Sequence, residues 1–364
     1  MHCVFPWYIM HVMKIIVSII LSLLILAGIS SPALSASEEN ASLPYLSLSE
    51  FLDEMDMDLE RFIAQMKEFA QSGVYPHYLE KNAARYEAYR AEHPDIPFAN
   101  VIAYVNVDLD KEHYLDVKEA QDFTESSILL NKTFFLPSFW SPDDLTEIGS
   151  RYLMRAEAAE NILLMQNAIT EDGLRLHIVS TYRPHERQVS LYNRGARSRG
   201  VAAADRNYAR PGHSEHQTGL AVDLLHRSHG GSLTSARFEN SELFTWLMQN
   251  AHEYGFILRY PEEYKEFHGY IFEPWHWRFV GVSIATAMHN EKMALYEEFY
   301  GRYITSDVLH RARELIYEHR AAIDAEAAAV LAAEEAAAQE AQKRDKTILR
   351  KDIINGNKKT DSLL

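Results

Sequence analysis

The stretch GHSEHQTGLAVDL, residues 212–224, places metal-ligand side chains at the start of an apolar run. His216 precedes Asp223 by seven positions, and Gly219 lies between them. A glycine lets the chain turn sharply, and Ala221 and Asp223 then share one face of the following strand because side chains alternate along a strand. The imidazole and the carboxylate are therefore predicted to converge on one point.

A second stretch with such residues, YIFEPWHWRFVG, follows about fifty residues later, and it offers Glu273 and His276. Pro274 prevents a regular hydrogen-bonded ladder between these two residues. Two histidines and one aspartate fit a three-ligand catalytic zinc site, in which the fourth position is left for water. A hydrolase of this kind needs a nearby carboxylate to take a proton from the water, and Glu273 is the candidate.

Composition limits the class of protein and the chemistry of its metal site. The chain has 364 residues with 47% hydrophobic composition, which is enough for an enzyme-sized core. The net charge of -16 argues against a nucleic-acid partner, which would require a basic face. Cys3 is the single cysteine, so neither a disulfide framework nor a cysteine-ligated zinc site can form. Any metal must be bound by His, Asp or Glu.

The N-terminus has the pattern of an export signal. Lys14 precedes an apolar run over 15–29, and the small residues Ala33 and Ser35 mark a cleavage site. We therefore expect a signal peptide over residues 1–36 and a mature protein in the periplasm or cell envelope. An uncleaved membrane anchor is the alternative, because the whole apolar stretch of about 26 residues is long enough to span a bilayer.

The remaining pattern predicts an α+β fold, with a small antiparallel sheet and flanking helices that hold the site. A helical arm is expected over 37–99, where apolar residues recur every three or four positions (Phe51, Met55, Leu59, Phe62, Met66 and Phe69). Further helices are predicted over 145–169, after Pro184 and over 241–255, and strands over 174–180, 220–225, 256–260 and 275–281. There is no repeating strand–helix unit and no glycine-rich nucleotide loop. The Ala/Glu-rich stretch within 301–364 predicts a long, solvated helix with a partly disordered end.

These motifs resemble the VanY-like D-alanyl-D-alanine carboxypeptidases of peptidase family M15. The family pattern S-x-H-x-x-G-x-A-x-D corresponds to Ser214, His216, Gly219, Ala221 and Asp223, and the second signature to EPWHWRFVG. The stretches LLNKTFFLPSFWSPDDL, STYRPHERQ and YGFILRYP are also similar to the family. The resemblance covers roughly residues 125 to 282, and the expected catalytic domain spans 100–300.

The resemblance implies a zinc-dependent carboxypeptidase that removes the C-terminal D-alanine from peptidoglycan stem peptides. It assigns roles as follows: His216, Asp223 and His276 as zinc ligands, Glu273 as catalytic base, Arg183 facing the oxyanion, and Gln188 and Ser214 in contact with the substrate. A fixed guanidinium that faces developing negative charge is most effective in a dry site. No ligand position departs from the family pattern.

Each assignment has a structural alternative. His216 and His276 could be core histidines, Asp223 could form a salt bridge, and Glu273 could orient a ligand histidine. Arg183 could pair with Asp144 or another carboxylate, while Gln188 and Ser214 could simply hold loops. The nearby histidines that do not match the pattern are expected to be solvated or in loops (His213, His226, His229 and His268).

Other functions also remain open at this stage. The same fold could act as an L,D-carboxypeptidase or a cell-wall endopeptidase, or as a non-catalytic zinc-fold module that binds the wall. An intact Glu273 argues against the binding module, which has no use for a base. The oligomeric state cannot be inferred from the sequence.

Overall fold

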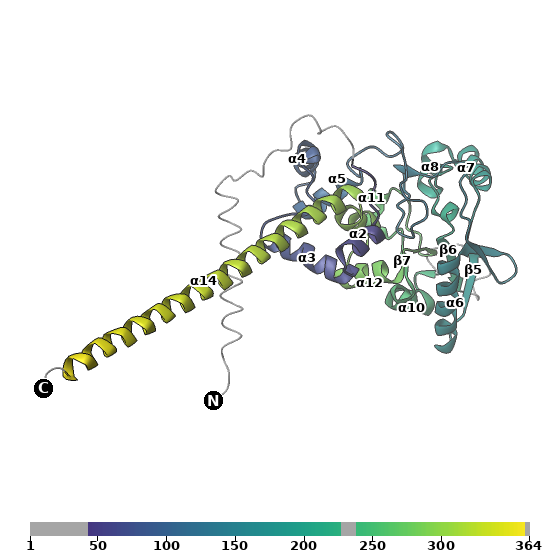
Figure 1. Ribbon diagram of the computed structural model, residues 1–364. Helices are drawn as coiled ribbons and strands as arrows, with labels where there is room; N and C mark the ends of the chain where they lie inside the picture. Colours follow the sequence, from purple (N-terminus) through teal and green to yellow (C-terminus); the bar gives the residue numbers. More distant parts are fainter. Residues whose placement is uncertain (1–42, 227–237, 361–364) are drawn as a thin grey trace. The chain divides into compact units, whose positions relative to one another are not determined.

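The computed structural model describes residues 43–226 and 238–360, and the expected signal segment lies outside these ranges (Figure 1). Within the described ranges, none of the helices combines the length and hydropathy that crossing a bilayer requires. The chain divides into two compact units, Met1–His310 and Arg311–Leu364. The first unit contains the motifs identified in the sequence.

The N-terminal arm is helical as predicted. Its helices are α2 (Leu48–Met55), α3 (Leu59–Gln71), α4 (Ala83–Glu92) after the short 3-10 helix η1 (Glu80–Asn82), and α5 (Phe98–Asn106). The apolar residues that predicted this arm are all buried (Phe51, Met55, Leu59, Phe62, Met66 and Phe69). The chain breaks between α2 and α3 because Asp56 adopts a left-handed conformation and the Asp58 side chain caps α3 by accepting from the Arg61 amide.

The centre of the first unit mixes short strands and helices. The strands before the four-stranded sheet are β1 (Lys118–Glu119), β2 (Phe134–Phe135), β3 (Leu145–Ile148) and β4 (Tyr152–Arg155). The helical elements are α6 (Ala156–Glu171), α7 (His185–Arg199), α8 (Val201–Asn207), η2 (Glu215–Thr218), α10 (Glu242–Asn250), η4 (Ala251–Tyr254), η5 (Glu262–Tyr264), α11 (Lys265–His268), α12 (Val282–Glu291) and α13 (Tyr296–Tyr303).

A four-stranded antiparallel sheet carries the site motifs, which confirms the α+β prediction. Its strands are β5 (Leu176–Ser180), β6 (Ala221–His226), β8 (His276–Phe279) and β7 (Phe256–Leu258), in that spatial order. One face is apolar, since Val222, Leu224 and Trp277 belong to a core cluster that also includes residues of α6 and α10. By strand alternation, Asp223 and His276 point to the other face.

The predicted helix over 145–169 is wrong in its first half. Residues 145–155 form the hairpin of β3 and β4, in which Ile148 pairs with Tyr152. Gly149 has φ +64°, a conformation that favours glycine and that a helix cannot contain. The Arg155 amide then donates to the Gly219 carbonyl, which joins the hairpin to the turn before β6. Helix α6 begins only at Ala156.

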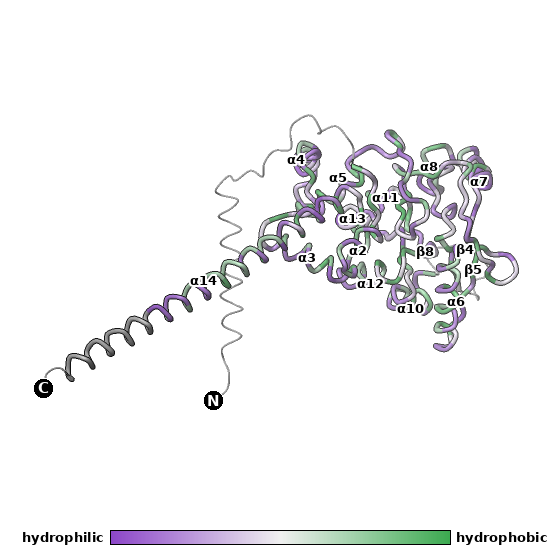
Figure 2. Tube along the Cα trace, in the orientation of Figure 1, coloured by the Kyte–Doolittle hydropathy of each residue, from purple (hydrophilic) through white to green (hydrophobic). Residues whose placement is uncertain are grey.

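The C-terminal helix α14 (Ser306–Thr360) accounts for most of the second unit. Its Ala/Glu-rich stretch over 321–343 is almost entirely exposed, as the composition predicted. Alanine and glutamate have high helix propensity, so such a helix needs little packing to form. Along the helices of the first unit, hydrophilic and hydrophobic residues are interspersed, as in amphipathic elements (Figure 2).

Candidate active site

Three side chains that suit a metal ion converge on the polar face of the sheet. His216, Asp223 and His276 each offer one ligand atom, and these atoms lie within 4.8 Å of one another. His216 Nε2 lies 3.3 Å from Asp223 Oδ2, and His276 Nδ1 lies 3.3 Å from Asp223 Oδ1. All three residues are buried. The structure therefore brings together the three residues that the sequence singled out as ligands.

Backbone geometry explains why these residues meet. Asp223 in β6 pairs directly with His276 in β8, so their side chains leave the same face of adjacent strands. His216 lies one turn earlier in η2, and Gly219 reverses the chain between them with φ +72°. A Cβ atom at position 219 would lie about 3.0 Å from a methyl group of Leu145, so glycine also permits this close packing.

Hydrogen bonds to the outer nitrogens fix which nitrogen of each histidine faces the cluster. His216 Nδ1 lies 2.7 Å from the Thr181 carbonyl oxygen, which can only accept, so this nitrogen carries the proton. His276 Nε2 lies 3.3 Å from a carboxylate oxygen of Glu215, and the same reasoning applies. Each ring can therefore keep a proton on its outer nitrogen while its inner nitrogen, His216 Nε2 or His276 Nδ1, binds a metal ion.

The environment of Asp223 also suits a cation. Its Oδ1 atom is buried, and among the described residues no donor makes a hydrogen bond to it. Burial alone would raise the pKa of Asp223, but His216 and His276 outweigh that effect and hold the pKa well below its usual range. A buried, ionised carboxylate oxygen without a donor is costly unless a cation binds it. Two imidazole nitrogens and one carboxylate oxygen match the ligand set of a catalytic zinc ion.

Glu273 lies beside this cluster in the loop before β8. Its Oε2 atom is 3.9 Å from His276 Nδ1, and its side chain is 14% exposed, so it reaches the cluster while remaining open to the cavity. Burial raises the pKa of Glu273 to about 7, although His276 and Arg183 oppose this shift. A carboxylate with a pKa near 7 can both accept and return a proton at neutral pH.

Arg183 also lies next to the cluster. Its Nη2 atom lies 3.8 Å from Asp223 Oδ2 and donates to Ser180 Oγ at 3.1 Å. Asp144, the alternative partner considered for this residue, instead pairs with Arg155 at 3.0 Å. The guanidinium of Arg183 therefore lies in the site, where it can face negative charge that develops on a substrate.

Gln188 and Ser214 occupy different kinds of position. The Gln188 side chain accepts from Arg183 Nη1 at 2.9 Å and donates to the Ala209 carbonyl at 2.7 Å. Both ends of its amide are thus engaged by the protein, and Gln188 braces Arg183. Ser214 is buried next to η2 and lines the same cavity as the cluster.

Four buried charged residues behind the cluster were missed by the sequence analysis: Glu215, Arg259, Arg278 and Glu297. Their side chains have no exposed surface, and ion pairs of 2.7 to 2.9 Å connect them. Arg259 and Arg278 stand in mainly apolar segments, FILRYP and HWRFVG. A charged side chain that is buried in such a segment must be paired. An arginine within each apolar segment was therefore the sequence feature that could have predicted buried ion pairs here.

Two of the nearby histidines, which were expected to be solvated or in loops, are buried: His213 in the loop before η2 and His268 at the end of α11. His213 is buried, and its Nδ1 lies 2.8 Å from the Asn131 carbonyl. His268 is buried, and its Nε2 lies 3.0 Å from the Pro261 carbonyl. Both histidines form hydrogen bonds with backbone carbonyl groups inside the fold. His229 and the side chain of His226 lie outside the described part of the chain.

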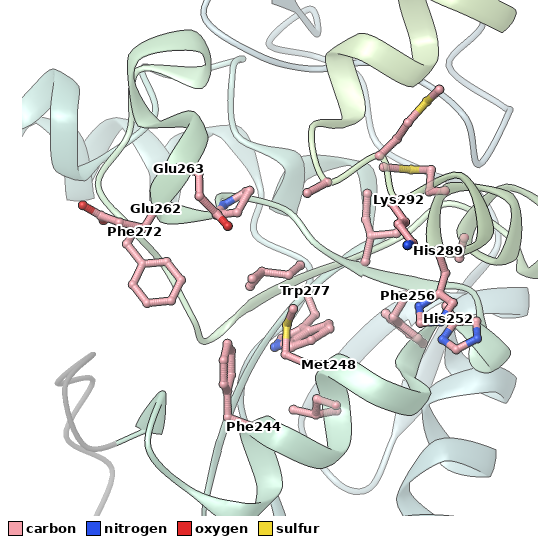
Figure 3. Close-up of a pocket in the computed structure, with 18 residues that line it drawn as sticks. Phe244, Met248, His252, Phe256, Glu262, Glu263, Phe272, Trp277, His289 and Lys292 are labelled. Carbon is pink, nitrogen blue, oxygen red and sulfur yellow. The ribbon is translucent and has the colours of Figure 1, made fainter.

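Two cavities adjoin the four-stranded sheet. The cavity of about 390 Å³ on the polar face is lined by the metal-site cluster together with Glu273, Arg183, Gln188, Tyr208 and Tyr270. A larger, mainly apolar cavity of about 560 Å³ is lined by Phe244, Phe272 and Trp277, and the stacked rings of His252 and His289 lie at one end of it (Figure 3). His276 and Trp277 are neighbours in β8, so alternation directs them into different cavities.

Comparison with known proteins identifies the family. Residues 151–282 match the family model of VanY, described as D-alanyl-D-alanine carboxypeptidase. YodJ of Bacillus subtilis, which is named as a carboxypeptidase, is 34% identical over 207 residues that cover 52% of this chain and 75% of YodJ. The chain belongs to the VanY family. It is accordingly a carboxypeptidase.

Two further proteins are similar to this chain over part of its length. The bifunctional D-Ala-D-Ala dipeptidase and carboxypeptidase VanXYC of Enterococcus gallinarum is 36% identical over 134 residues, which cover 36% of this chain and 70% of VanXYC. The solved structure of the L,D-carboxypeptidase LdcB is 33% identical and covers 51% of this chain and 90% of that chain, with a TM-score of 0.48.

Proposed function

We propose that this VanY-family protein is a zinc-dependent carboxypeptidase that removes the C-terminal D-alanine from peptidoglycan stem peptides. The observation that carries the proposal is the convergence of His216, Asp223 and His276, with Glu273 and Arg183 beside them, in one cavity. The name of VanXYC supports D-Ala-D-Ala termini as the substrate class. Ser214 is a substrate contact in this proposal, because it lines the cavity.

Each of these groups has a separate role in hydrolysis. Bound zinc supplies Lewis-acid chemistry, which makes water a better nucleophile and polarises the scissile carbonyl. Glu273 takes a proton from the attacking water as the new carbon–oxygen bond forms. It then gives this proton to the amine nitrogen as the carbon–nitrogen bond breaks. Arg183 stabilises the negative charge that develops on the carbonyl oxygen between these steps.

The proposal includes export. Peptidoglycan lies outside the cytoplasmic membrane, so an enzyme that trims it must reach the periplasm or the cell envelope. The apolar run over 15–29 and the small residues that follow it fit a cleaved signal peptide. We also propose that the arm over 37–99 and the tail over 301–364 are accessory to a catalytic domain over 100–300.

The experiment that tests the function compares two synthetic stem peptides. Purified protein is incubated with a pentapeptide that ends in D-Ala-D-Ala and with the tetrapeptide that lacks the last residue, with and without a chelator. The proposal predicts release of D-alanine from the pentapeptide only, loss of release with the chelator, and recovery when zinc is added back. Preferential cleavage of the tetrapeptide would indicate an L,D-carboxypeptidase, and no cleavage of either peptide would indicate a binding module or an endopeptidase.

A further inference from the structure

A buried chain of charged side chains lies directly behind His276. Glu215 Oε2 is 3.3 Å from His276 Nε2, while Glu215 Oε1 accepts from Arg259 Nε at 2.9 Å and from Arg278 Nη1 at 2.7 Å. The side chains of Glu215 and of both arginines have no exposed surface. The two carboxylate oxygens of Glu215 therefore have different partners: one faces the imidazole and the other faces two guanidinium groups.

The arginines are held in turn by groups outside the four-stranded sheet. Arg259 makes two hydrogen bonds to Glu297, from Nη1 at 2.9 Å and from Nη2 at 2.7 Å. Arg278 donates to the carbonyl oxygens of Ser126 and Ile128. Glu297 lies in α13, beyond the 151–282 range that matches the family model. The polar contacts of His276 thus extend to a helix that the family match does not include.

We propose that Glu215 is a positioning residue that fixes the tautomer of His276 for metal binding, and that Glu297 holds Glu215 in place through Arg259. The inference rests on the proposed zinc site. A carboxylate accepts but cannot donate, so Glu215 favours a proton on His276 Nε2, in competition with Asp223 Oδ1, which lies at the same 3.3 Å from Nδ1. The lone pair of the neutral ring is then on Nδ1, which faces Asp223. Such partners of metal-binding histidines orient the ring and select the nitrogen that binds.

The arrangement requires a carboxylate and not an amide at position 215. If Glu215 were glutamine, its single oxygen would face the two guanidinium groups, because they are charged donors and cannot accept. The amide NH₂ would then face His276 Nε2. An NH₂ group donates, so Nε2 would have to accept, and the ring proton would move to Nδ1. The nitrogen needed by the metal would no longer offer a lone pair.

The first test is therefore Glu215→Gln, with two readouts other than activity. Nitrogen-15 NMR of the histidine rings in metal-free protein, at a pH where the rings are neutral, reports the tautomer of His276. Competition with a chelator reports the zinc dissociation constant. We expect the proton to move from Nε2 to Nδ1 and zinc binding to weaken by about 10- to 100-fold. An unchanged tautomer and an unchanged zinc affinity would overturn the inference.

The second test compares adjacent glutamates of α13 and remains decisive if the first variant fails to fold. Glu298 is also buried, but it pairs with Arg302 at 2.8 Å and accepts from the Tyr104 hydroxyl, away from the chain of charges. Glu297→Gln should weaken zinc binding on the order of 10-fold, whereas Glu298→Gln should leave it unchanged. Equal effects of the two variants, or none, would refute a specific link through Arg259.

The two proposals fail in different ways. If the unaltered protein binds no zinc, the proposed function is wrong, yet the NMR comparison still reports whether Glu215 sets the tautomer. If the unaltered protein binds zinc and both the Glu215 and the Glu297 variant bind it equally well, the zinc site stands and the positioning role is wrong.

Discussion

Asp223 and His276 lie opposite each other in the register of β6 and β8, and Asp223 Oδ1 is 3.3 Å from His276 Nδ1. The hydrogen-bonded backbones of two adjacent strands therefore set the separation of two of the three proposed ligands. His216 joins them from η2, where the Thr181 carbonyl fixes its ring. A site built on regular elements in this way needs little rearrangement to bind a metal ion.

Removal of His276 should empty the metal site. The purified protein should hold about one zinc ion, with ligand distances near 2.0 to 2.2 Å, and His276→Ala should lose it because two ligands cannot retain the ion. Elemental analysis of dialysed protein measures the zinc content. The control is His213→Ala, which removes a buried histidine that lies outside the cluster and should keep the zinc. Full zinc occupancy in His276→Ala would remove His276 from the ligand set.

Arg183 and Gln188 should differ in the size of their effects. Arg183→Ala removes the proposed oxyanion donor and should lower kcat by about 10²- to 10³-fold while zinc stays bound. Gln188→Ala removes only the brace that accepts from Arg183, so the loss should be on the order of 10-fold. Steady-state kinetics with the D-Ala-D-Ala peptide measures both. A larger defect in Gln188→Ala than in Arg183→Ala would indicate that Gln188 itself contacts the substrate.

The packing of α13 on α5 should not tolerate a side chain at Gly301. A Cβ atom there would collide with the backbone carbonyl of Ala103, which cannot move without shifting α5. Gly301→Ala should therefore lower the free energy of unfolding by about 1–3 kcal/mol, despite the higher helix propensity of alanine. The control is Gly195→Ala in α7, where the added methyl group meets only the ring of Tyr208. Denaturant unfolding should show the smaller loss for Gly195→Ala.

If the protein is exported as proposed, its mature N-terminus should be the product of signal-peptide cleavage. Protein recovered from the producing cell should begin near Ala36 or Ser37, because the small residues before this point fit a signal-peptidase site. N-terminal sequencing or intact mass measures this directly. A membrane-bound form that retains Lys14 would show that the apolar run over 15–29 is an anchor.

The sequence predicted that His216 and Asp223 meet because the determinants of this contact are local. The spacing of His216, Gly219 and Asp223 defines a turn followed by a strand, and strand alternation then determines which side chains share a face. The apolar stripe of the N-terminal arm was equally informative, since a three-to-four-residue period has few structural solutions. Neither prediction depended on which strands pair, whereas the position of His276 opposite Asp223 depends on the pairing of β6 with β8.

The rest of the site depends on contacts between distant segments. Glu215 is adjacent to a predicted ligand, but its role follows from Arg259 and Arg278, which only the sheet brings next to it. The partner of Arg183 could not be chosen among several carboxylates for the same reason. The misread segment over 145–155 is apolar enough for a helix, and only the positive φ at Gly149 and pairing across the hairpin show it to be β-structure.

Glu273→Gln provides the most direct test of the proposed mechanism. The amide keeps the size of the side chain but cannot accept the proton from water. With zinc content and turnover of the D-Ala-D-Ala pentapeptide measured on the same sample, we expect zinc to remain bound and kcat to fall by about 10²- to 10⁴-fold. Near-normal release of D-alanine by the zinc-loaded variant would contradict the mechanism and would leave Glu273 as a residue that only orients His276.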